Sequence, residues 1–280
     1  MFKGCSGGTA VRAIGMTTLQ LAMAAFTVAS ADGMAQTETV HAALATRPGW
    51  EIGLQGAHYR YEEPGFMSLT GNRGGLTAAY NFTDARGAFS RIDIRESYGR
   101  LKYESTSTGS ANSIPDLIVE GRVVTGWDFF LGQSFSFSPY AGLGYRYLYD
   151  DPRGYSSTGA AGYRRESNYI YAPLGFTARV HLGSRWVLAP TLEADVFLRG
   201  LQTSRLSDAN VGLHDVINTQ DSGRGYRGAL MLEKDHWALG AWTHYWWIND
   251  SDVQSVGAGL AGQEPRNRTR ESGLEIRYRF

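Results

Sequence analysis

The sequence lacks three features: an excess of one charge, a cysteine after Cys5 and, beyond its first 35 residues, a long apolar run. Basic and acidic residues number 27 each, so the formal net charge is zero, and no basic run favours nucleic acid as a partner. Without cysteine, most of the chain can form no disulfide and use no thiol chemistry. Without a long apolar run after residue 35, it contains no candidate for a membrane-spanning helix.

The first 35 residues have the pattern of a secretory signal peptide. Lys3 and Arg12 are the only charges before residue 32, and an alanine-rich apolar run follows Arg12. Two small-residue cleavage motifs come next, ending at Ala31 and Ala35. A transmembrane anchor is the alternative, but polar residues interrupt the run and leave it short of the ~20 residues that a span needs. We therefore predict a signal peptide over 1–35, cleaved after Ala31 or Ala35.

The last nine residues, 272–280, alternate between two kinds of side chain. Side chains alternate faces along a strand, so this segment would have one apolar and one ionic face. The apolar positions are Leu274, Ile276, Tyr278 and Phe280, and the charged positions are Glu275, Arg277 and Arg279. A soluble sheet with its charges in water would give the same pattern, so the interpretation depends on the rest of the chain.

Nine further segments show strand periodicity, which predicts an all-β fold of about ten strands. The expected strands cover Trp50–Tyr61, Leu76–Phe82, Ala88–Tyr103, Leu117–Leu131, Ser136–Tyr149, Ile170–Leu182, Trp186–Leu198, Tyr226–Glu233, Trp237–Trp247 and Ser272–Phe280. The third is the least regular, because several charged residues interrupt it. The length after the signal peptide suits one large β-domain or two small ones.

The connections between these segments alternate in length. Those after the even-numbered strands are short, and those after the odd-numbered strands are mostly long. An antiparallel up-and-down transmembrane β-barrel predicts this alternation, with short periplasmic turns and long extracellular loops. In lipid only helices and closed sheets satisfy their backbone hydrogen bonds, so a membrane protein without spanning helices must be a barrel. We predict a barrel over 49–280, with its apolar face towards lipid, preceded by a short periplasmic segment over 36–48.

The closing strand with its terminal Phe280 resembles that of bacterial outer-membrane β-barrels, and the strand number is similar to an omptin or opacity-protein topology. The resemblance covers essentially the whole chain after the signal peptide and rests on pattern, not on a family-specific motif. It implies a location in the bacterial outer membrane, with both termini in the periplasm. It also implies outer-membrane lipid as the surroundings and the barrel-assembly machinery as a partner that reads the strand ending in Phe280.

The same alternation places charged side chains inside the barrel, where acids and bases nearly balance. They are Glu51, Glu120, Asp128, Glu193, Asp195, Glu233 and Glu275, against Arg122, Arg146, Arg179, Arg199, Arg227, Arg277 and Arg279. Barrels of about eight strands are filled by side chains, whereas open aqueous channels need about sixteen. We therefore predict an ion-paired and largely closed lumen.

Function is less constrained, because a fold alone does not imply an activity. The leading hypothesis is a surface-exposed binding protein or adhesin, or a structural membrane protein, with an extracellular ligand that the sequence does not identify. An omptin-like protease is an alternative, with Asp150-Asp151 and His214-Asp215 as candidates for activating a water molecule, although Asp also favours turns. A lipid-modifying hydrolase and a narrow small-solute channel are further alternatives. We assign no catalytic residue, no metal ligand and no cofactor.

Three arginines occupy alternate positions where the last loop enters the closing strand: Arg266, Arg268 and Arg270. Alternation places all three on one face near the outer rim, with Arg164 and Arg165 at a similar height. Because guanidinium groups pair well with phosphate, we predict that the three arginines bind lipopolysaccharide phosphates. The alternative is a solvated rim that balances loop acids such as Glu264 and Glu271.

Overall fold

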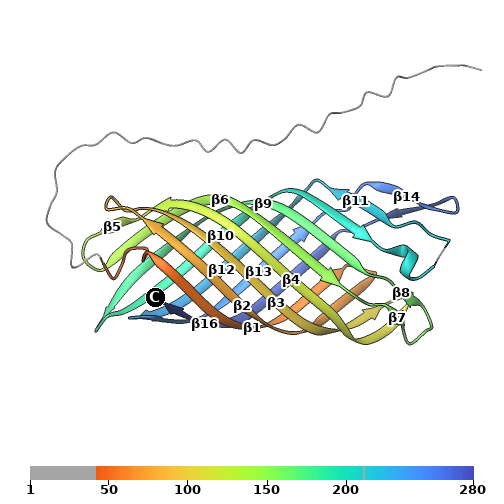
Figure 1. The fold of residues 1–280 in the computed structure, drawn as a ribbon, viewed down its shortest axis with the longest axis horizontal. Helices are drawn as coiled ribbons and strands as arrows, with labels where there is room; N and C mark the ends of the chain where they lie inside the picture. The colour runs from red at the N-terminus through yellow and green to blue at the C-terminus, as the bar shows by residue number, and fades with distance from the viewer. Residues whose placement is uncertain (1–41, 211) are drawn as a thin grey trace, which may run out of the picture. The chain divides into compact units, whose positions relative to one another are not determined.

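The computed structural model describes residues 42–210 and 212–280, most of which lie in β-strands (Figure 1). The predicted signal peptide over 1–35 and its two cleavage sites lie outside the described residues. Within the described part of the chain, no helix is long and apolar enough to cross a membrane.

Ten long antiparallel strands form a closed barrel, as the sequence predicted. They are β1 (Gly49–Glu63), β2 (Met67–Thr83), β3 (Ala88–Ser105), β4 (Gly109–Trp127), β6 (Phe135–Asp150), β9 (Arg165–Gly183), β10 (Trp186–Ser204), β12 (Gly223–Lys234), β13 (Trp237–Ile248) and β16 (Asn267–Arg279). The barrel closes because β1 pairs with β2 on one side and with β16 on the other. Closure leaves none of these ten strands with an unpaired edge.

The shorter elements lie in the connections. They are β5 (Phe129–Leu131), β7 (Gly154–Tyr155), β8 (Ala161–Gly162), the 3₁₀-helix η1 (Leu206–Asp208), β11 (Val216–Gln220), β14 (Val253–Gly257) and β15 (Leu260–Gln263). The predicted strand over Leu117–Leu131 is divided in two, because β4 ends at Trp127 and β5 starts after Asp128. The barrel strands also run longer than predicted, so residues 62–63 and most of the polar segment 105–113 are strand, whereas 64–66 and 106–108 form turns.

The two ends of the barrel differ in their connections (Figure 1). One end, called here the termini end, carries residue 49, Phe280 and short turns such as Ser184-Arg185, whose φ angles of 48° and 66° form a tight hairpin. The opposite end, called the loop end, carries the β7–β8 and β14–β15 hairpins and β11. The three long connections, 151–164, 205–222 and 249–266, are all at the loop end.

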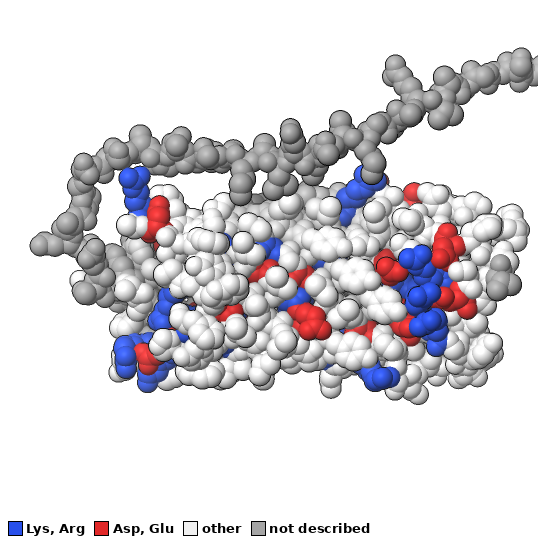
Figure 2. All heavy atoms as spheres, in the orientation of Figure 1, with Lys and Arg blue, Asp and Glu red and all other residues white. Residues whose placement is uncertain are grey.

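The outer surface of the barrel carries an apolar belt. Its large side chains project from nearly every strand, and Leu274 is 65% exposed. Members include Trp50, Ile52, Leu54, Leu76, Ile92, Ile94, Val123, Leu143, Leu174, Leu192, Leu230, Leu239, Leu274 and Ile276. Uncharged side chains cover most of the face shown in Figure 2. An exposed apolar face around a buried ionic one is the arrangement that a bilayer stabilises.

Towards the loop end the two faces exchange character. On β1, Ile52 and Leu54 point outward, but beyond Ala57 the outward positions become His58, Arg60 and Glu62. The inward positions Tyr59 and Tyr61 are buried there. Strands β2, β3, β4, β9 and β10 contain 17 to 19 residues, whereas a tilted spanning strand needs only about 9–11. The loop-end part of the barrel is therefore built like a soluble domain, with apolar side chains inside and polar ones outside.

Candidate functional site

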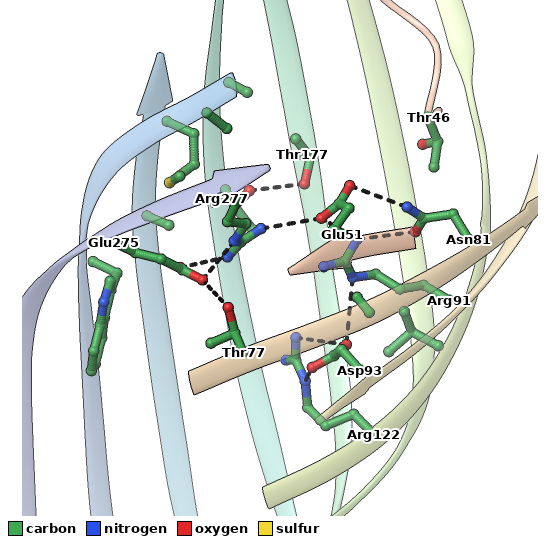
Figure 3. Close-up of a pocket in the computed structure, with 18 of the residues that line it drawn as sticks. Thr46, Glu51, Thr77, Asn81, Arg91, Asp93, Arg122, Thr177, Glu275 and Arg277 are labelled. Carbon is green, nitrogen blue, oxygen red and sulfur yellow. Dashed lines mark hydrogen bonds and ion pairs between the residues drawn. The ribbon is translucent and has the colours of Figure 1, made fainter. Parts of the chain in front are cut away.

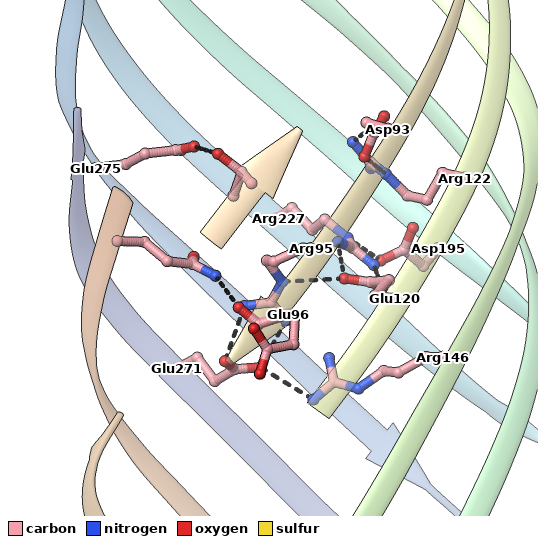
Figure 4. Close-up of polar contacts among 12 residues, drawn as sticks. Asp93, Arg95, Glu96, Glu120, Arg122, Arg146, Asp195, Arg227, Glu271 and Glu275 are labelled. Atoms are coloured by element: carbon pink, nitrogen blue, oxygen red, sulfur yellow. Dashed lines mark hydrogen bonds and ion pairs between the residues drawn. The ribbon is translucent and has the colours of Figure 1, made fainter. Parts of the chain in front are cut away.

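A network of ion pairs crosses the middle of the lumen and is called here the lumen network (Figure 4). Glu271 on β16 accepts hydrogen bonds from Arg95 at 2.9 and 3.1 Å and from Arg146 at 3.0 Å. Glu120 on β4 accepts hydrogen bonds from Arg95 at 3.3 Å and from Arg227 at 3.0 Å. All five side chains are buried. The network joins β3, β4 and β6 to β12 and β16 across the lumen.

More ion pairs continue from the network towards the termini end (Figure 3). Arg122 binds Asp93 at 2.9 Å and Glu193 at 2.7 Å. Glu51 accepts from Arg91 at 3.0 Å and lies 3.7 Å from Arg277. These side chains surround a polar cavity of about 200 Å³ inside the barrel.

The chain before β1 folds into the same end of the lumen. Leu44 is completely buried, and its carbonyl oxygen accepts a hydrogen bond from Ser136 at 2.7 Å. The backbone N–H of Thr46 donates to Asp128 at 2.6 Å. Arg47 donates to the carbonyl oxygen of Asp235. Thr46 and Arg47 both line the cavity, so this segment narrows the termini end of the lumen.

An apolar cluster fills the lumen on the loop-end side of the network. Its members are Tyr59, Tyr61, Leu69, Leu101, Ile114, Ile118, Leu148, Tyr169, Tyr171, Phe197, Trp246 and Ile248. Tyr171 ties the cluster to the network, because its hydroxyl donates to Glu120 at 2.6 Å and its ring centroid lies 5.0 Å from that of Trp246. Sequence reasoning did not find this cluster. The sequence feature that could have predicted the cluster is the alternation of Tyr59 and Tyr61 with the polar residues His58 and Arg60.

Most charges predicted to face the lumen do so. The structure confirms the inward placement of Glu51, Glu120, Asp128, Glu193, Asp195, Glu233, Glu275, Arg122, Arg146, Arg179, Arg227, Arg277 and Arg279. The prediction for Arg199 is wrong, and its side chain is exposed. A register shift between Phe197 and Arg199 in β10 inserts an extra residue and reverses the alternation from that point.

Central members of the lumen were missed. Arg95 belonged to the irregular third strand, and Glu271 was read as a rim acid. Arg73 and Asp116, which form a buried ion pair, lie just outside the predicted strand bounds. Charge at alternate positions of β3 was the available signal for Arg95, since Arg91, Asp93 and Arg95 all face inward.

The residues considered for a protease are not brought together. Asp151 binds Arg153 at 2.7 Å within its own loop. Asp215 accepts a hydrogen bond from Ser207 at 2.6 Å in the next long loop. Among the described residues, no hydrogen bond joins the Asp150-Asp151 pair to His214-Asp215. The same residues contain no group of three or more His, Cys, Asp or Glu side chains that could hold a metal ion.

The predicted rim arginines lie on the outer surface at the loop end. Arg266 and Arg270 are exposed, and the guanidinium of Arg268 stacks 4.6 Å from the ring centroid of Trp247. Arg224 stacks on the same ring at 4.9 Å. Arg60 on β1 lies opposite Arg270 in the strand pairing. We call Arg60, Arg224, Arg266, Arg268 and Arg270 the rim arginines from here on.

The acids expected to balance this rim face elsewhere. Glu271 lies in the lumen network, and Glu264 is buried against Arg165 at 2.5 Å. Arg165 faces inward with Glu264 and so does not belong to the rim. Arg164 binds Asp208 at 2.7 Å, and this hydrogen bonding lowers the pKa of Asp208 to about 2. The solvated-rim alternative therefore loses both acids that supported it.

The fold matches a known outer-membrane barrel. Outer membrane protease OmpT from Escherichia coli aligns with a TM-score of 0.51 at 8% identity, covering 82% of this chain and 96% of that one. Neisserial surface protein A aligns with a TM-score of 0.33 at 15% identity, covering 83% and 97%. Ail from Yersinia pestis aligns with a TM-score of 0.31 at 12% identity, covering 83% and 100%. No family model and no curated protein sequence matches the chain. At 8% identity, the likeness to OmpT shows the fold alone.

Replacing Glu271 by Gln tests the lumen network. The substitution keeps the shape but leaves Arg146 without a buried counter-charge and Arg95 with Glu120 alone, so we expect a loss of about 3–5 kcal/mol in the free energy of unfolding. Denaturant unfolding in lipid vesicles, followed by tryptophan fluorescence, measures it. The control is Glu104→Gln, whose partner Lys102 is as exposed as Glu104 itself, and whose loss should cost less than about 1 kcal/mol. Equal small losses for both variants would contradict a stabilising network.

Proposed function

We propose that this protein is an integral barrel of the bacterial outer membrane that does not transport solutes and binds partners at the cell surface through its loop end. The observation that carries the proposal is the double obstruction of the lumen. The lumen network blocks its middle, and the apolar cluster fills the part nearest the loops. A narrow solute channel would need a continuous polar path through both layers.

The structure of the two ends supports a periplasmic termini end and an extracellular loop end. The start of β1 and the end of β16 lie at the termini end together with short turns, whereas the long connections lie at the opposite end. The strands also extend beyond the apolar belt at the loop end, where their outward side chains become polar. Phe280 is 68% exposed at the termini end, where it can meet the barrel-assembly machinery during biogenesis.

A binding or structural role fits this end better than a hydrolytic one. The loop end carries the β7–β8 and β14–β15 hairpins above strands whose outward side chains are polar, and this surface can bind a partner. Two of the candidate acids, Asp151 and Asp215, are each bound by a residue of their own loop. An adhesin and a membrane-stabilising protein are both compatible with this surface, and the ligand discriminates between them.

Lipopolysaccharide is the partner that the rim supports best. The rim arginines lie beyond the apolar belt towards the loop end, which supports contact with phosphates of the outer leaflet. Arg268 and Arg224 flank Trp247, an aromatic residue of the type that gathers at membrane interfaces. Of the rim arginines, Arg60 pairs with Glu62 at 3.5 Å, and the other four have no ion-pair partner within residues 42–210 and 212–280. Guanidinium groups in this position are free to bind phosphate.

A closed lumen predicts no ionic conductance. Purified, refolded protein inserted into planar bilayers should give no ohmic current, because the network and the apolar cluster exclude a continuous column of water. Heat-modifiable migration on gels serves as the control that the inserted protein is folded. Reproducible current steps from the folded protein would refute the closed lumen and favour the channel.

Removing three rim arginines should weaken binding to lipopolysaccharide. The Arg266→Ala, Arg268→Ala and Arg270→Ala variant loses charge-assisted hydrogen bonds to phosphate, so we expect affinity to fall by about tenfold or more. Titration of the barrel in phospholipid nanodiscs with purified lipopolysaccharide measures this change.

The matched control removes the same charge at the termini end, through Arg86→Ala, Arg185→Ala and Lys234→Ala. All three lie in or beside short turns there. Their loss should leave the affinity unchanged. If both triple variants bound lipopolysaccharide like the original protein, the rim assignment would be wrong.

A further inference from the structure

A cavity of about 240 Å³ opens at the loop end and is called here the mouth cavity. It lies between the β1–β2 turn, the β3–β4 turn and the connection that carries β7 and β8. Its floor is apolar, since Met67, Leu69 and Tyr103 line it. Met67 and Tyr103 pack against the apolar cluster of the lumen. Phe66 is 58% exposed at its edge.

One wall of the mouth cavity is ionic and carries more acid than base. Glu63, Asp150 and Arg165 line this wall, and Glu264 lies behind it. Arg165 binds Glu63 at 2.8 Å and Glu264 at 2.5 Å, and it donates to the Tyr61 hydroxyl at 2.8 Å. One guanidinium thus stands among three carboxyl groups. Burial, reinforced by the charge of Glu63, raises the pKa of Glu264 to about 8.

Asp150 is the carboxyl group that the wall leaves unpaired. Its Oδ2 atom is buried and has no hydrogen-bond partner among the described residues. Nearby basic groups are already engaged: Arg165 by Glu63 and Glu264, and Arg73 by Asp116. A buried acceptor without a donor costs free energy that a ligand can recover.

We propose that the mouth cavity binds a small molecule with an apolar body and one ammonium group. The ammonium donates to Asp150 and offsets the excess negative charge of the wall. The apolar body lies against Met67, Leu69 and Tyr103. This inference rests on the proposed function only in placing the cavity at the cell surface, and it extends that function by naming the chemistry of a ligand.

Phenethylamine is a suitable probe, because it carries an aromatic body and a single ammonium. Its matched analogues are 2-phenylethanol, which lacks the charge, and 3-phenylpropionate, which reverses it. Titration calorimetry with the barrel in nanodiscs, against empty nanodiscs, compares the three. We expect the amine to bind and each analogue to bind at least about tenfold more weakly.

Asp150→Asn keeps the shape of the side chain and removes its charge. It should weaken amine binding by at least about tenfold, because the ammonium then meets a neutral amide oxygen in place of a carboxylate. Asp151→Asn is the control, since Asp151 is paired with Arg153 and does not line the cavity. The Asn variant at 150 is expected to fold, which gel migration verifies before titration.

Three results would overturn the proposal: no amine binding at millimolar concentration, equal binding of the amine and the alcohol, or equal affinities for the Asp150 and Asp151 variants. Nanodiscs expose both ends of the barrel, so these results test ligand binding in the cavity whichever end of the barrel faces the cell exterior. Labelling of a cysteine introduced at Ser107 with a membrane-impermeant reagent on intact cells judges the orientation separately.

Discussion

Paired burial of charge is the constraint on which this barrel depends. A ring of ten strands is too narrow for a wide aqueous channel, so side chains that alternation turns inward lose most of their water. An unpaired buried charge would cost several kcal/mol. Glu271 between Arg95 and Arg146, and Arg227 beside three carboxylates, show how that cost is offset. At the level where the outer face is apolar, ion pairs consequently cross the lumen.

The outer face of the same strands is apolar along one part of their length and polar along the other. Where lipid surrounds the barrel, Leu54 points outward and Gln55 inward; farther along β1, Arg60 points outward and Tyr61 inward. Alternation continues without a break, and only the environment of each face changes. The exchange marks the level at which the barrel leaves the apolar belt. It also explains why the loop end holds both an apolar cluster and a cavity with a structured wall.

Alternation made the belt and much of the lumen predictable, because its period of two survives in each spanning segment. The closing strand was predicted on both faces for this reason. In β1, the alternation continues through His58–Tyr61, but apolar and polar side chains exchange faces there. Arg199 was assigned to the wrong face because β10 contains a bulge, and the residues at the bulge carry no sequence signal for it. The Arg73–Asp116 pair depends on strand register, which no single segment specifies.

The account is tested most directly by measuring which face of β16 meets hydrocarbon. Nitroxide labels placed one at a time on cysteines from 272 to 279, in the protein without Cys5, report collisions with oxygen dissolved in the bilayer. The expected result is a period of two, with frequent collisions at even positions such as Ile276 and few at odd positions such as Glu275. The opposite phase, with the even positions shielded, would mean that the apolar residues form the core of a soluble sheet, and the membrane barrel would be contradicted.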